Sequence, residues 1–98
     1  MNSLAKGKRA ELEYKKKMEA RGLICYKPVW SRFSTMKDIF NLFDIIGINK
    51  DVVELVQVKS NRCPKKVQEQ IKAFPVPKNV KKIIAIRIDG GVWIELAS

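Results

Sequence analysis

The sequence predicts an α/β fold in which a small mixed β-sheet is flanked by helices, in the order α-β-β-β-α-β-β. Three observations predict it. An amphipathic segment near the N-terminus ends at Gly22, two runs rich in Ile and Val are separated by turn residues 49–51, and two further apolar runs are separated by turn residues 89–91. The chain of 98 residues is long enough for one domain with a single core.

The first helix is expected from about Ser3 or Gly7 to Arg21, with Gly22 as its C′ residue. A helix in the second half of the chain is expected to open at Pro64, a residue that suits the first helical turn. The other expected elements are strands over residues 23–30, 80–88 and 92–96, and a stripe on the second helix formed by Val67, Ile71 and Phe74.

Glu11 lies on the apolar face that we expect for the first helix. Glu13 lies about 200° around the helix from Glu11, which predicts a place on the solvent side. The alternative role for Glu11 is a surface ion pair with Lys15, one turn further along. Spacings of seven, three and four residues define the apolar stripe of Leu4, Glu11, Tyr14 and Met18.

The segment FDIIGINKDVVELVQVKS predicts a β-hairpin, with strands over residues 43–48 and 52–59. If Lys50-Asp51 is the loop, Asp44 lies opposite Gln57. The other pairs on that face are then Ile46 with Leu55 and Ile48 with Val53.

Two other loops are compatible with this hairpin sequence. An Asn49-Lys50 loop moves the register by two and keeps the same side chains on each face, whereas an odd-length loop with a bulge changes the alignment. Asp44, Gln57 and Lys59 at the end of a buried strand pair are costly to place there without a use. The alternative is a basic strand end with an incidental Gln and Lys.

The order of Asp44, Gln57 and Lys59 resembles the PD-(D/E)xK nuclease superfamily, in which one strand supplies an Asp and the next supplies an acid or Gln, a spacer and a Lys. Twelve residues separate Asp44 from Gln57, a spacing familiar in that group, and the Gln version resembles Mrr-type restriction endonucleases. The segment GKRAELEYKKKMEARGLICYKPVWSRFS is similar to the start of archaeal Holliday junction resolvases. This chain departs from the pattern at Phe43, where Pro is usual, and at Gln57, where an acid is usual.

The resemblance implies a restriction-endonuclease-like fold for residues 1–98 as a single nuclease domain, with Mg²⁺ as cofactor and Mn²⁺ able to substitute. Glu11, Asp44 and Gln57, with the Val58 carbonyl, would then hold the metal through oxygen ligands. Lys59 would orient or help deprotonate the attacking water, or neutralise charge on the phosphate. The residues expected to contact DNA are Lys8, Arg9, Ser31, Arg32, Ser34, Lys37, Ser60 and Arg62.

Composition agrees with a DNA partner. With 20 Lys and Arg against 10 Asp and Glu, the formal net charge is +10, which favours a polyanion and a salt-sensitive affinity. A merely solvated basic surface is the alternative. No apolar run approaches the roughly 20 residues that span a bilayer, and the N-terminus has no apolar stretch typical of a signal peptide. We therefore expect no membrane partner and an intracellular location, in cytoplasm or nucleoid, for a protein of cellular, viral or phage origin.

The two cysteines, Cys25 and Cys63, are expected to be reduced structural thiols, because disulfides are rare in most cytosolic proteins. The chain has no His, which argues against a zinc site and against the usual hydrolase triads.

The functional hypothesis with most support is a Mg²⁺-dependent, structure-selective endonuclease that resolves DNA junctions. One alternative is an Mrr-like or phage-type nuclease that cuts duplex or branched DNA, and another is a non-catalytic nucleic-acid-binding module on the same fold. A junction or duplex has two scissile strands, so a C2 homodimer is expected. The C-terminal hairpin, including Trp93, is the expected interface.

Overall fold

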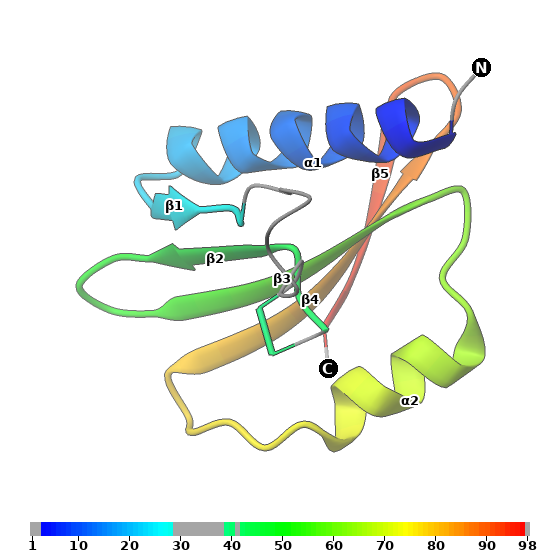
Figure 1. The fold of residues 1–98 in the computed structure, drawn as a ribbon. Coiled ribbons are helices and arrows are strands. Elements are labelled where there is room, and N and C mark those ends of the chain that lie inside the picture. The colour runs from blue at the N-terminus through cyan, green and yellow to red at the C-terminus, as the bar shows by residue number, and fades with distance from the viewer. Residues whose placement is uncertain (1–2, 29–38, 41, 98) are drawn as a thin grey trace.

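A computed structural model describes residues 3–28, 39–40 and 42–97, which form a five-stranded sheet between two helices (Figure 1). Helix α1, Ser3–Ala20, lies over one face of the sheet, and helix α2, Lys65–Ala73, lies against the other. Within the described part of the chain, no helix is both long and apolar enough to cross a membrane. The strands are β1 (Ile24–Tyr26), β2 (Ile45–Ile48), β3 (Val53–Ser60), β4 (Val80–Ile88) and β5 (Val92–Ala97).

The sheet is mixed because α2 carries the chain from β3 across to β4. These two strands are parallel, and every other neighbouring pair in the order β1-β2-β3-β4-β5 is antiparallel. A parallel pair needs a long crossover, whereas tight turns are enough for the antiparallel pairs. The predicted element order and the predicted mixed sheet are both confirmed.

Each helix is held to the sheet by its own apolar cluster. On the α1 side, Tyr14 and Met18 are fully buried with Val56, as the predicted stripe requires. On the α2 side, Ile71 is fully buried with Leu55. Successive residues of β3 therefore serve opposite clusters, so both faces of this central strand are buried.

Gly47 in β2 allows α1 to lie close to the sheet. A Cβ atom at this position would come within 2.5 Å of Met18 Cε, so a side chain here would force the end of the Met18 side chain to move. Gly22, with φ +91°, ends α1 in the left-handed conformation and confirms the predicted C′ residue. Gly22 thus ends the helix, and Gly47 lies against Met18 near the end of the helix.

One strand predicted in this half of the molecule is too long. Of the strand expected over residues 23–30, the structure shows only Ile24–Tyr26, because β1 has four-residue β2 as its partner, and residues 29–30 lie outside the described residues. Glu13 lies on the solvent side as expected, with its side chain 41% exposed, and it accepts a hydrogen bond from Arg87 Nε at 2.7 Å. Helical periodicity gives the angle of Glu13 around the axis, but an arginine on β4 is long enough to reach it beside the sheet.

Candidate functional site

The β2–β3 hairpin has the register expected for a Lys50-Asp51 loop. Ile46 pairs with Leu55 and Ile48 pairs with Val53. The turn is fixed by Asn49, whose Oδ1 accepts from the backbone N–H groups of Asp51 and Val52 at 2.8 and 2.9 Å. The polar residues at the open end of the hairpin are therefore placed by a well-defined ladder.

This register does not continue to Asp44. Strand β2 begins at Ile45, which pairs with Val56, and the Asp44 N–H donates to the carbonyl of the same Val56 at 2.7 Å. Phe43 and Ile46 both pack in the cluster beneath α2, although regular alternation would put residues three apart on opposite faces. One extra residue therefore forms a β-bulge, and the predicted pairing of Asp44 directly opposite Gln57 is wrong.

The bulge directs the Asp44 carboxylate at the backbone of β3. Asp44 is 8% exposed, and its Oδ2 accepts from the Val58 N–H at 2.7 Å. A residue in a strand directs its N–H and its C=O to the same neighbouring strand, so the Val58 carbonyl faces the same side as this carboxylate. The predicted pair of oxygen ligands, Asp44 and the Val58 carbonyl, thus lies at one edge of β3.

Gln57 and Lys59 lie at the same end of β3 and contact each other. Gln57 is 7% exposed, and both polar atoms of its amide are satisfied in one orientation. In that orientation, which the hydrogen-bond network assigns, the nitrogen donates to Leu42 O and the oxygen accepts from Lys59 Nζ at 3.3 Å. The half-buried Lys59 is thereby held beside the amide.

The Glu11 carboxylate is held by a lysine that sequence reasoning missed. Glu11 Oε1 lies 3.2 Å from Lys27 Nζ, and the two side chains are 24% and 16% exposed. The alternative pairing with Lys15 does not form, since Lys15 binds Glu19 at 3.2 Å. The alternation of β1 could have revealed Lys27, because Cys25 packs toward α1 and residues two apart in an extended chain share a face.

The structure describes four of the eight residues expected to contact DNA. Lys8 and Arg9 are exposed on α1, Ser60 ends β3 half-buried, and Arg62 is exposed just beyond it. The other four expected contacts lie outside the described residues: Ser31, Arg32, Ser34 and Lys37.

Glu54, which would be the replacement acid if Gln57 were no ligand, is committed elsewhere. Its two carboxylate oxygens accept from Arg21 NH2 and NH1 at 2.8 and 3.1 Å, a bidentate pair that raises the pKa of the arginine. Glu54 lies near the opposite end of β3 from Lys59. This pair therefore ties α1 to the sheet and stands apart from the polar end of the hairpin.

Cys25 and Cys63 are free, as the sequence predicts. Burial raises the pKa of both thiols, so they remain protonated and unreactive at neutral pH.

The oxygen donors at the open end of the hairpin fit a hard divalent cation, although the site carries little negative charge. Carboxylate, amide and backbone carbonyl oxygens are ligands that Mg²⁺ accepts, and Asp44 is buried with its carboxylate fixed. In the described ranges, no group of three or more Asp, Glu, Cys or His side chains gathers as a metal site would. Among the described residues, a cation at the hairpin end would therefore depend on the Gln57 and Val58 oxygens beside the Asp44 carboxylate, whereas Glu11 contacts Lys27.

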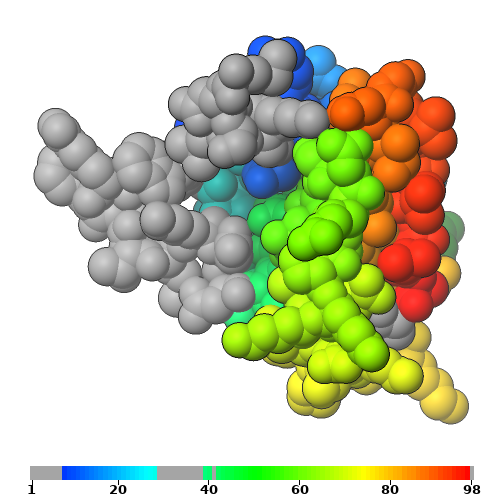
Figure 2. All heavy atoms as spheres, turned by 90° about the vertical axis from the view of Figure 1, so that its right-hand side faces the viewer, coloured from blue at the N-terminus to red at the C-terminus, as the bar shows by residue number. Residues whose placement is uncertain are grey.

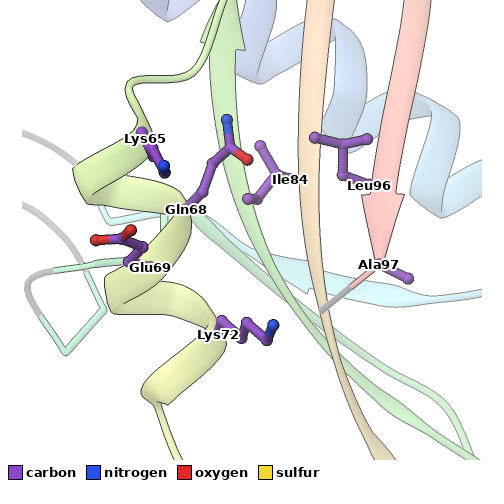
Figure 3. Close-up of a pocket in the computed structure, with 7 residues that line it drawn as sticks. All are labelled: Lys65, Gln68, Glu69, Lys72, Ile84, Leu96 and Ala97. Atoms are coloured by element: carbon purple, nitrogen blue, oxygen red, sulfur yellow. The ribbon is translucent and has the colours of Figure 1, made fainter.

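A separate groove of about 620 Å³ lies between α2 and the last two strands. Figure 2 shows the yellow-green part of the chain that includes α2 beside the orange-to-red C-terminal strand on this face. Figure 3 shows Gln68 extending from α2 toward Ile84 and Leu96 on the sheet, with Lys65 and Lys72 along the helix. None of the candidate catalytic residues lines this groove.

Strand β5 leaves apolar side chains uncovered beside the groove. Val92, Ile94 and Leu96 are 59%, 44% and 36% exposed. Trp93, which was expected at this apolar edge, packs instead on Tyr14 with a ring-centroid distance of 5.0 Å. The apolar residues of the edge are therefore those that alternate with Trp93.

Comparison with solved structures finds this fold in Hjc, a Holliday junction resolvase from the archaeal hyperthermophile Archaeoglobus fulgidus. The TM-score is 0.66, and the match covers 93% of this chain and 76% of that chain at 16% sequence identity. The fold is therefore restriction-endonuclease-like, as the sequence predicts. A scan of known protein families and a search of curated proteins find no match.

Proposed function

We propose that this protein is a Mg²⁺-dependent endonuclease that hydrolyses DNA phosphodiester bonds. The observation that carries the proposal is the polar end of the β2–β3 hairpin within a restriction-endonuclease-like fold, where buried Asp44 accepts from the Val58 N–H and buried Gln57 contacts the half-buried Lys59. Buried polar groups at a strand end are costly, and catalysis is a use that repays this cost.

Asp44 and Glu11, with the Gln57 amide oxygen and the Val58 carbonyl, would hold Mg²⁺ or Mn²⁺. The bound ion would lower the pKa of a water and offset negative charge on the phosphate. The Asp44 carboxylate would be oriented before metal binds, because the Val58 N–H donates to one of its oxygens. Gln57 contributes no charge, so we expect weaker metal affinity than in a site with a third carboxylate.

Lys59 would act on the reacting phosphate. Its ammonium is half-buried and held by the Gln57 oxygen at 3.3 Å, so it is positioned before substrate arrives. A compact cation there would stabilise the charge that develops on the phosphate and orient the attacking water.

Branched DNA, with the four-way junction as first choice, is the proposed substrate. The likeness to Hjc supports it, because that protein is a Holliday junction resolvase. The formal charge of +10 supports binding to DNA, and Lys8, Arg9 and Arg62 are exposed basic residues that could contact phosphates. Action on DNA also supports the intracellular location expected from the sequence.

The second candidate function is a non-catalytic DNA-binding module. Two observations favour it: Gln57 stands where an acid is usual, and Glu11 is paired with Lys27. The third candidate, an Mrr-like or phage-type nuclease on duplex DNA, differs from the first only in substrate.

A cleavage assay separates these functions. Linear duplex, single strand, flap and four-way junction would each be incubated with and without Mg²⁺. Mg²⁺-dependent nicking of the junction above the other substrates is the expected result, and equal cutting of linear duplex would favour the duplex nuclease. Binding without cleavage on all four would contradict the catalytic proposal and favour the binding module.

A further inference from the structure

The Glu11–Lys27 ion pair joins two elements and is used by no step proposed above. Glu11 belongs to α1, and Lys27 directly follows β1, which packs on α1 through Cys25, as does Leu23 just before the strand. Both side chains are mostly buried, so water and salt screen their attraction less than for a surface pair. The ammonium is therefore a persistent neighbour of this carboxylate.

The charge balance of the candidate site makes this neighbour important. Among the described residues that the proposed function assigns to the site or that contact them, the carboxylates of Glu11 and Asp44 are matched by the ammonium groups of Lys27 and Lys59, because Gln57 is neutral. A divalent cation is attracted by each carboxylate and repelled by each ammonium, and both effects weaken with distance. A site with no net negative charge binds such a cation weakly unless one ammonium withdraws.

We propose that Lys27 is a positioning residue that competes with the divalent cation for Glu11. In the metal-free protein Lys27 holds the Glu11 carboxylate, and the carboxylate can coordinate metal only after this contact is released. The inference rests on the proposed function, because it requires Glu11 to be a metal ligand. Lys27 then sets the metal concentration at which the site fills.

The test is direct titration of the full-length, metal-free protein with Mn²⁺, followed by calorimetry or by the electron paramagnetic resonance signal of free Mn²⁺. Lys27→Gln should bind Mn²⁺ roughly three- to ten-fold more tightly than wild type, as expected when one partly buried ion pair no longer competes. Lys27→Arg, which keeps the ion pair, should bind like wild type.

Lys15→Gln is the matched control. This substitution also removes one positive charge. Lys15 forms an ion pair with Glu19 on α1 at 3.2 Å, the distance that also separates Lys27 from Glu11. A general effect of net charge would tighten Mn²⁺ binding equally in both variants, and that result would overturn the proposal. Lys27→Met, which keeps the apolar stem, replaces Lys27→Gln if thermal unfolding shows that Gln loosens the fold.

A double-mutant cycle assigns the effect to Glu11. In the Glu11→Gln background, Lys27→Gln should no longer tighten Mn²⁺ binding, and an undiminished effect would overturn the proposal. If Mn²⁺ binds with the same affinity whether or not Lys27 is substituted, only the role proposed for Lys27 is overturned. Absence of Mn²⁺ binding by every variant would overturn the metal-dependent function as well.

Discussion

Gln57 is a hydrogen-bond donor in one contact and an acceptor in another. Its amide nitrogen donates to Leu42 O, and its amide oxygen accepts from Lys59 Nζ. A carboxylate at this position could keep the second contact but not the first, because it has no proton to donate at neutral pH. Residue 57 therefore contributes to the fold as well as to the proposed metal site.

The two substitutions of Gln57 should have opposite effects on metal dependence. Gln57→Glu adds a charged ligand and should lower the Mg²⁺ concentration needed for cleavage, on the order of ten-fold, whereas Gln57→Ala should raise it or remove activity. Without metal, Gln57→Glu should melt at a lower temperature than wild type, because Leu42 O loses its donor. Cleavage as a function of Mg²⁺ and melting curves with and without Mg²⁺ measure these effects.

A Gln57 series in which both variants keep the wild-type metal dependence would show that Gln57 is not a ligand. Its role would then be limited to holding Lys59 and the Leu42 carbonyl.

The candidate residues could be predicted from the sequence, but the bulge that aims Asp44 could not. Asp44, Gln57 and Lys59 stand out because they are polar residues at the end of apolar strands. The bulge depends on Phe43, which is fully buried and packs edge-on against Phe74 at a centroid distance of 5.4 Å. Burial of a large ring outweighs regular strand alternation, and this contact with α2 is not visible in the local sequence.

At the scale of elements, Lys82 joins α2 to β4. It is 6% exposed, and its Nζ donates to the carbonyls of Ile71, Lys72 and Phe74 at 2.8, 2.9 and 2.7 Å. Carbonyls in the last turn of a helix lack partners within the helix, and a cation there is favourable. In the sequence, Lys82 looks like part of a short basic patch with Lys81, although alternation places it on the face of Ile84.

Lys82→Met should destabilise the protein by about 2–3 kcal/mol, because the partly buried carbonyls of Lys72 and Phe74 lose the ammonium that donates to them and Ile71 O keeps only the Phe74 N–H. Lys81→Met, a change at the exposed neighbour, is the control and should alter the free energy of unfolding by less than about 0.5 kcal/mol. Urea denaturation measures both. Equal losses for the two variants would mean that the Lys82 contacts contribute nothing to stability.

Element boundaries that depend on local signals could be predicted well. The hairpin turn at Asn49, the left-handed Gly22 and the turn before β5 each have a backbone requirement that few residues meet. The short β1 and the contact between Glu13 and Arg87 were not predictable, because each depends on a partner distant in sequence.

At the scale of the whole molecule, one domain offers one candidate site, whereas a junction presents two strands for cutting. A C2 homodimer would supply two sites. Edge strand β5, with Val92, Ile94 and Leu96 exposed beside the groove under α2, is the apolar surface that we propose to meet a second copy.

Leu96→Lys should therefore yield monomers in sedimentation at concentrations where the wild-type protein is dimeric, because it places a charge in the interface. Leu12→Lys is the matched control, since Leu12 is an exposed leucine on α1, across the sheet from the groove that Leu96 lines, and should leave the dimer intact. Wild-type protein that sediments as a monomer both free and on DNA would refute the dimer.

The central claim is that the Asp44 end of the hairpin is the catalytic centre. The most direct test compares Mg²⁺-dependent nicking of a four-way junction by wild type, Asp44→Asn and Asp51→Asn. Asp51 is an exposed acid in the turn of the same hairpin, so its substitution controls for the loss of one negative charge. Asp44→Asn should abolish nicking with DNA affinity and melting cooperativity retained, and Asp51→Asn should cut like wild type. Nicking by Asp44→Asn at the wild-type rate would contradict the account.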